Sequence, residues 1–213
     1  QSFGGLMASG LLNVVGEHMN GLQMAGIANI TASKLNGVQI ALCNYATQAR
    51  GLQIGLVNYY KEDMKGFQLG LVNANPDTRV QMMVYGGNAT PANIGVRFKN
   101  QLFYTILGIG SMYQGLNDKF SASASYRAGL SFTLYKGLSI SGDLGYQHIE
   151  AFDNKDEVIP KRLYALQARA NLEYQFTRKF GIYATGGYGL TRFYNKSSNY
   201  DKGAIIEAGI VLF

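Results

Sequence analysis

Two long segments of the chain alternate strictly between apolar and polar residues. In residues 119–135 the even positions are all apolar, and the odd positions between them are small or polar. Residues 162–176 repeat the pattern, with one face formed by Tyr164, Leu166, Ala168, Ala170, Leu172, Tyr174 and Phe176. A period of two puts alternate residues on opposite faces of a β-strand, whereas the 3.6-residue period of a helix would scatter both sets around its axis. Both segments therefore predict β-strands with one apolar face.

The length of these strands and the nature of their polar face distinguish two classes of all-β protein. The strands run to about 13–16 residues, whereas strands of soluble proteins usually have about 5–6. Their polar face carries mostly small, uncharged residues, and only 15% of the chain is charged, against roughly 25% in soluble domains. Short turns near residues 99–100, 135–137 and 177–179 alternate with longer loops at 114–118, 151–161 and 195–202. We therefore expect an antiparallel transmembrane β-barrel, and a soluble β-sandwich is the less favoured alternative.

The first third of the chain is a repeat array. Five copies of a pattern close to Gly-x-Gln-x-Gly-Leu-x-Asn end at Asn13, Asn29, Asn44, Asn58 and Asn73. A spacing of 14 to 16 residues between these asparagines fits either barrel strands with turns or a stacked solenoid. Solenoid repeats are usually longer, at roughly 20 residues or more, and about ten tilted residues cross a bilayer as a strand. The repeats are therefore expected to be barrel strands.

The repetition over residues 5–73 resembles the surface-repeat outer-membrane proteins found mainly in Bacteroidetes and spirochaetes. The segment 204–213 resembles the outer-membrane insertion signal, a last strand that ends in an aromatic residue. It departs from that signal because Glu207 and Gly209 share the parity of Phe213. These resemblances imply the outer membrane of a Gram-negative bacterium, and they imply no chemistry.

The candidate strands number thirteen, and single-chain bacterial barrels normally have an even count. We therefore predict one barrel domain over residues 1–213 with about 12 strands, in a range of 10–14. In this arrangement residues 1–20 form a periplasmic segment or a plug in the lumen. Residues 21–73 are the Gly-rich repeat strands, and residues 79–213 are the long strands.

Neither catalysis nor metal binding has a clear signature in the sequence. His18 and His148 have acidic neighbours, but no nucleophile motif accompanies them, and no set of residues has metal-ligand spacing. The single cysteine, Cys43, cannot form an internal disulfide and is expected to be buried. The net charge of +6 is not clustered, which argues against nucleic-acid binding. The expected partners are outer-membrane lipid and lipopolysaccharide, with other outer-membrane proteins as further candidates, and no cofactor is expected.

Charged residues on the inward parity of the long strands form the only candidate site. Arg127, Asp143 and Arg169 fall at similar heights on three consecutive strands, with Glu173 one level away. A charge in a narrow lumen is costly unless it is paired, so we predict an Arg127–Asp143–Arg169 network. It would brace a closed barrel or form a charged constriction that selects solutes. The matching functions are a non-enzymatic structural or accessory subunit of an outer-membrane assembly and, as the alternative, a narrow porin-like diffusion channel. An outer-membrane enzyme is a distant third.

Overall fold

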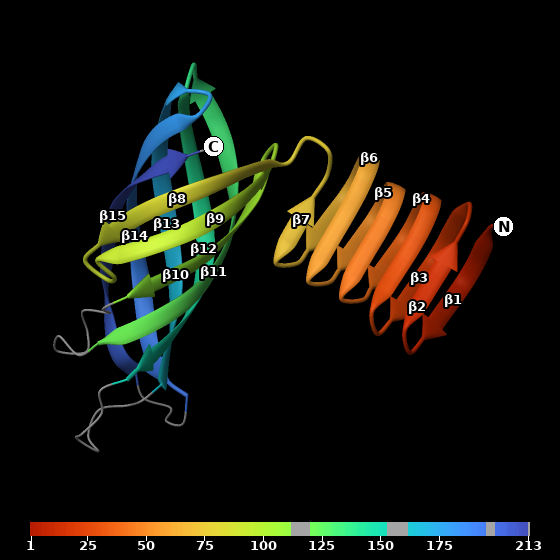
Figure 1. Ribbon diagram of the computed structural model, residues 1–213, viewed down its shortest axis with the longest axis horizontal. Helices are drawn as coiled ribbons and strands as arrows, with labels where there is room; N and C mark the ends of the chain where they lie inside the picture. The colour runs from red at the N-terminus through yellow and green to blue at the C-terminus, as the bar shows by residue number, and fades with distance from the viewer. Residues whose placement is uncertain (112–119, 153–161, 195–198, 213) are drawn as a thin grey trace. The chain divides into compact units, whose positions relative to one another are not determined.

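The computed structural model describes residues 1–111, 120–152, 162–194 and 199–212 of the chain. The chain divides into two compact units, Gln1–Thr78 and Arg79–Phe213, each built from β-strands (Figure 1). The single domain expected over residues 1–213 is therefore wrong. Among the described residues, no helix has the length and apolar character needed to cross a membrane.

The second unit is a closed antiparallel barrel of eight strands, in the order β10-β11-β12-β13-β14-β15-β8-β9. The expected count of about 12 is wrong, because the barrel closes on itself without the repeats. The eight strands are β8 (Arg79–Gly87), β9 (Ala92–Asn100), β10 (Phe103–Ser111), β11 (Ser121–Tyr135), β12 (Leu138–Ala151), β13 (Arg162–Thr177), β14 (Phe180–Phe193) and β15 (Asn199–Leu212). The two strands with the strictest alternation, expected at residues 119–135 and 162–176, end within two residues of the observed β11 and β13.

The two faces of the barrel wall have the polarity that the alternation predicts. On β13, the polar residues from Gln167 to Glu173 point inward and are buried, whereas Leu166 and Leu172 are exposed on the outside. The same division on β11 buries Ser121, Ser123 and Ser131. An apolar exterior around a polar interior is the reverse of a soluble barrel and is the arrangement of a transmembrane one.

The strands β8, β9 and β10 have nine residues each, and β11 to β15 have 14 to 16. As a result, β8 pairs with β15 only from Glu207 to Leu212, and the N-terminal half of β15 continues beyond it. Asn88 follows β8 and extends the pairing with its side chain, which donates to the Ala204 carbonyl at 2.8 Å and accepts from the Ile206 amide at 2.9 Å. This end of the barrel holds the longer connections, whereas Arg79 and Leu212 lie at the end with the short turns.

The first unit is a stack of parallel strands, so the expectation that residues 21–73 are barrel strands is wrong. Residues 1–20 are not a separate segment or plug either, because they contain two strands of this stack and the start of a third. Its strands are β1 (Phe3–Ser9), β2 (Leu12–Val15), β3 (His18–Ala25), β4 (Ala28–Ile40), β5 (Cys43–Ile54), β6 (Val57–Leu69) and β7 (Val72–Ala74). Successive repeats pair in register, so each repeat is one coil of a β-solenoid.

Each coil has a short arm and a long arm that face each other. In β4 these arms are residues 28–31 and 34–40, which pair separately with the corresponding parts of β5. Hydrogen bonds cross between the arms, for example from Gln39 Nε2 to Thr31 Oγ1 at 3.2 Å. Where the arms meet at the bend, the space between them is filled by an apolar cluster made of Val15, Met19, Leu35, Ala46 and Ala49.

The repeated residues of the motif form ladders along the stack. Parallel in-register pairing places Asn on Asn and Gln on Gln. Thus Asn29 Nδ2 donates to Asn44 Oδ1 at 3.0 Å, and Gln53 Nε2 donates to Gln39 Oε1 at 2.9 Å. Gly37 is needed because its φ is +143° and a Cβ there would lie 1.9 Å from the carbonyl oxygen of Gly21. The glycines, asparagines and glutamines of the repeated motif are therefore the residues that in-register stacking of the coils requires.

Candidate functional site

Six charged side chains are buried together in the part of the barrel that the structure describes, and we refer to them as the ionic belt. They are three arginines and three carboxylates, so their formal charges cancel. Each of the six residues is between 2% and 7% exposed. The belt consists of Arg97 on β9, Arg127 on β11, Asp143 on β12, Arg169 and Glu173 on β13, and Glu207 on β15.

The centre of the belt is the pair Arg127–Asp143. The Arg127 guanidinium donates from Nε to Oδ1 and from Nη2 to Oδ2 of Asp143, both at 2.8 Å. Asp143 also accepts hydrogen bonds from the Tyr104 hydroxyl at 2.7 Å and from Asn171 Nδ2 at 2.8 Å. Bidentate, charge-assisted contacts of this kind are the strongest hydrogen bonds that proteins form.

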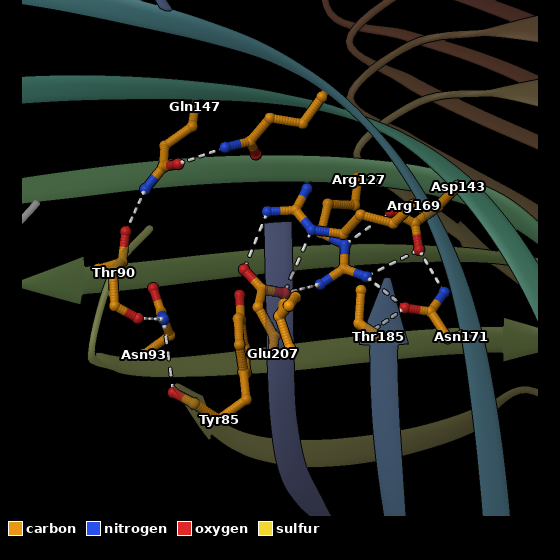
Figure 2. A network of polar contacts seen from close by, with 12 residues as sticks. Tyr85, Thr90, Asn93, Arg127, Asp143, Gln147, Arg169, Asn171, Thr185 and Glu207 are labelled. Carbon is orange, nitrogen blue, oxygen red and sulfur yellow. Dashed lines mark hydrogen bonds and ion pairs between the residues drawn. The ribbon is translucent and has the colours of Figure 1, made fainter. Parts of the chain in front are cut away.

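Arg169 lies opposite Asp143 in the pairing of β12 with β13, as its parity predicts, but its guanidinium turns to another partner. It donates to the two carboxylate oxygens of Glu207 at 3.1 and 3.2 Å. Of the expected Arg127–Asp143–Arg169 network, the Arg127–Asp143 pair is therefore present, and Arg169 joins through Glu207, which lies 3.7 Å from Arg127 Nη1. Figure 2 shows these side chains converging from several strands toward Glu207 and Asn171.

Glu173 belongs to a second pair. Its carboxylate accepts hydrogen bonds from Arg97 Nη1 at 2.6 Å and Nη2 at 3.0 Å, and Arg97 Nε donates to Gln81 Oε1 at 2.6 Å. Arg97 and Glu207 were not among the expected site residues. Both had a usable signal: Arg97 shares its parity with Asn93 and Gly95 on β9, and Glu207 had the parity that conflicted with an outward last strand.

Small residues on the neighbouring strands make room for the long guanidinium groups. Arg127 is paired with Gly145 across β11 and β12, and Arg169 is paired with Gly187 across β13 and β14. A Cβ on Gly145 would lie 3.0 Å from Arg169 Nη1 and 3.2 Å from Arg127 Cγ. These glycines let two arginines occupy one level of a narrow lumen.

Apolar and polar side chains fill the interior around the belt. One apolar cluster contains Met83, Tyr85, Tyr104, Ile106, Tyr183 and Val211. The other contains Ile149, Ala151, Leu163 and Ala165 near the loop end, with Phe193 and Tyr200 packed against it. Between this second cluster and the belt, Gln147 donates to Ser123 Oγ at 2.8 Å and accepts from Gln167 at 3.0 Å. An eight-stranded barrel has an interior about wide enough for such filling.

A polar pocket of about 460 Å³ lies where β15 extends beyond β8. It is lined by residues that include Asn88, Gln167, Thr191, Asp201 and Lys202. The described residues contain no cluster of histidine, cysteine or carboxylate side chains suited to a metal ion. His148 lies 3.4 Å from Glu150 and hydrogen-bonds Tyr194 at 2.7 Å, and all three residues are at least partly exposed.

No family model and no curated protein matches the sequence. Among solved structures, the chain is similar to the N-terminal β-barrel domain of Pseudomonas aeruginosa OprF, with 16% identity, a TM-score of 0.40, and coverage of 62% of this chain and 93% of that one. It is also similar to the Yersinia pestis outer-membrane protein Ail, with 15% identity, a TM-score of 0.39, and coverage of 64% and 99%. A de novo designed transmembrane β-barrel matches with 14% identity, a TM-score of 0.39, and coverage of 62% and 91%.

Proposed function

We propose that this chain is a non-enzymatic protein of a Gram-negative outer membrane, in which a sealed barrel anchors the repeat unit. It would serve there as a structural or accessory component of an outer-membrane assembly. The observation that carries the proposal is the inverted polarity of the barrel, with six mutually paired charges inside and leucine, isoleucine and aromatic residues outside. In water such an exterior would be a large aggregation-prone surface, whereas in lipid it is the stable arrangement.

The pairing within the ionic belt supports a barrel that acts as a membrane anchor more than one that acts as a channel. A pore that selects ions needs charges available to the solute. Here each of the three carboxylates accepts two hydrogen bonds from an arginine. The belt therefore braces strands β9, β11, β12, β13 and β15 against one another.

A narrow diffusion channel is the second candidate, and the polar pocket at the loop end is the observation that favours it. The pocket is lined in part by Gln167, which donates a hydrogen bond to Gln147 between the ionic belt and the end of the barrel that holds the longer connections. A solute that entered would still have to pass the level of Arg127 and Asp143. The two functions therefore differ in whether ions cross that level.

The membrane location is tested by labelling the full chain in phospholipid vesicles with a photoactivated carbene reagent dissolved in the lipid. We expect modification at outward residues such as Leu144, Leu166 and Ile206, and none at Gln147 or Asn171, which face the interior. Labelling of these outward residues by a water-borne reagent instead would refute the transmembrane barrel.

A further inference from the structure

The outer surface of the repeat unit is divided into an apolar half and a charged half. On the long arms the division falls at the glycine ladder that contains Gly37 and Gly51. On one side of it, two in-register rows are apolar: Leu22, Val38, Leu52 and Phe67, then Met24, Ile40, Ile54 and Leu69. On the other side the rows are polar: His18, Lys34, Gln48 and Asp63, then Asn20, Asn36, Arg50 and Lys65.

We call the edge formed by residues 10–12, 26–28, 41–43, 55–57 and 70–72 the turn edge. The opposite edge, at residues 16–17, 32–33, 47 and 61–62, is the bend edge, where the chain passes from a short arm to a long arm. Nearly all charged residues of the unit lie at or within three residues of the bend edge, and the exception, Asp77, follows the last coil. The turn edge and the arm segments beside it contain no charged residue. One leucine or isoleucine per coil projects from the turn edge, at Leu11, Ile27, Leu42, Leu56 and Leu71, each 37% to 66% exposed.

Backbone and side-chain hydrogen bonds join successive coils at the turn edge. The backbone of each turn bonds to the next, as in Cys43 N to Ile27 O at 2.9 Å and Leu56 N to Leu42 O at 2.8 Å. Behind the turns, Asn44 Nδ2 donates to the Ile54 carbonyl at 2.7 Å and to Asn58 Oδ1 at 2.9 Å. Internal pairing of this kind suits the hydrocarbon of a bilayer, because each unpaired polar group there costs several kcal/mol.

Tyrosines mark the boundary between the two halves on the short arms. Tyr45 and Tyr59 are stacked on the outer face, with ring centroids 5.8 Å apart, two residues beyond the turn edge. The Tyr45 hydroxyl lies 3.4 Å from Thr47 Oγ1, on the side of the bend edge. Tyrosine is favoured at membrane interfaces because its ring is apolar and its hydroxyl is polar.

We propose that the turn edge of the repeat unit inserts into one leaflet of a phospholipid bilayer. The five steps of the chain from Gly37 to Leu42 extend about 16 Å at ~3.3 Å per residue, close to half of the ~30 Å hydrocarbon core. A protein partner would be expected to meet a surface with hydrogen-bonding groups at its rim, whereas this edge offers almost only aliphatic side chains. The inference rests on the proposed function in one respect, because the barrel holds the chain at the membrane that the turn edge enters.

Cys43 provides a probe that needs no substitution. It is the only cysteine of the chain and, against the sequence-based expectation, it is exposed, directly beside Leu42 on the turn edge. A nitroxide spin label is attached to Cys43 of the full chain in phosphatidylcholine–phosphatidylglycerol vesicles. Its collision rates are then measured with oxygen, which partitions into lipid, and with a water-soluble nickel chelate. We expect the oxygen-to-nickel collision ratio at Cys43 to exceed that at the bend edge several-fold.

Two control variants carry the label elsewhere in a Cys43→Ser background. Ala32→Cys places it at the exposed bend edge, and Leu144→Cys places it on the outside of the barrel, where Leu144 is 72% exposed. If Leu144→Cys reports lipid while Cys43 reports water, lipid insertion of the turn edge is wrong and the barrel stands. If both report water, the transmembrane barrel itself is wrong. Protection of Cys43 from both reagents, with dipolar broadening that disappears on dilution with unlabelled protein, would identify a second copy and overturn the lipid assignment.

Discussion

Arg127 and Asp143 are joined inside the barrel by two parallel hydrogen bonds of 2.8 Å, and they lie on adjacent antiparallel strands. Only 2% of the arginine and 4% of the aspartate is exposed. Forming a buried ion pair costs the hydration energy of both charged groups. Removing one partner costs more, because the other charge then remains buried without compensation. The pair therefore identifies where substitution should affect the barrel most.

Asp143→Asn is expected to destabilise the barrel by about 3 kcal/mol, at the lower end of the range for breaking a buried pair. The value should not be higher because Glu207 lies 3.7 Å from Arg127 and offers partial compensation. Guanidinium unfolding of the full chain in lipid vesicles measures the change in free energy.

Glu150→Gln is the matched control for that experiment. Glu150 also accepts two hydrogen bonds from an arginine, Arg162, at 3.0 and 3.1 Å, but both side chains are partly exposed near the loop end. Exposed pairs contribute about 0–1 kcal/mol. Equal losses for the two variants would show that burial of the belt has no energetic role.

Arg97 and Glu173 should be energetically coupled. In a double-mutant cycle with Arg97→Met and Glu173→Gln, we expect a coupling of about 1–3 kcal/mol, the upper part of the range for contacting residues. Pairing Arg97→Met with Glu150→Gln should give additive losses within ~0.5 kcal/mol, because the two sites share no partner. Additivity in the first cycle would mean that the 2.6 Å contact between Arg97 and Glu173 contributes no interaction energy.

The barrel was predictable because its strands alternate with a period of two between apolar residues on one face and polar residues on the other. The residues from Gln167 to Glu173 predicted the inward face of β13, and counting through the turns placed Arg127 and Asp143 near each other. Which carboxylate each arginine selects could not be predicted. Arg169 is opposite Asp143 on the backbone, yet its guanidinium reaches past β14 to Glu207 on β15, and strand parity does not encode that choice of partner.

The solenoid was missed because strand parity does not distinguish a barrel strand from a coil. A stronger signal was the identity of the repeated residues. In-register parallel stacking places Asn44 next to Asn29 and Gln53 next to Gln39. This recurrence is favourable because each side-chain amide hydrogen-bonds the identical amide of the neighbouring coil. Antiparallel barrel strands have no such requirement, so exact recurrence of buried amides favours stacking.

Gly37→Ala should disrupt the repeat unit while leaving the barrel folded. The φ of +143° is a region that residues with a side chain occupy at a cost of about 1–3 kcal/mol, and a Cβ would also collide with the carbonyl oxygen of Gly21 at 1.9 Å. Limited proteolysis should cut within residues 1–78 of the variant and spare the barrel. Gly10→Ala is the control, because nothing lies within 4 Å of a Cβ there. Equal resistance of Gly37→Ala and Gly10→Ala would contradict the observed ladder.

The sealed barrel is tested most directly by the conductance of the full chain in planar lipid bilayers, for the wild type and for Asp143→Asn. The ionic belt and the apolar clusters beside it predict no steady conductance for the wild type. Asp143→Asn should also stay closed, or flicker without ion selectivity, because the remaining side chains still occupy the lumen. A stable wild-type channel whose cation-to-anion preference changes in Asp143→Asn would contradict the anchor and establish the belt as a selectivity constriction.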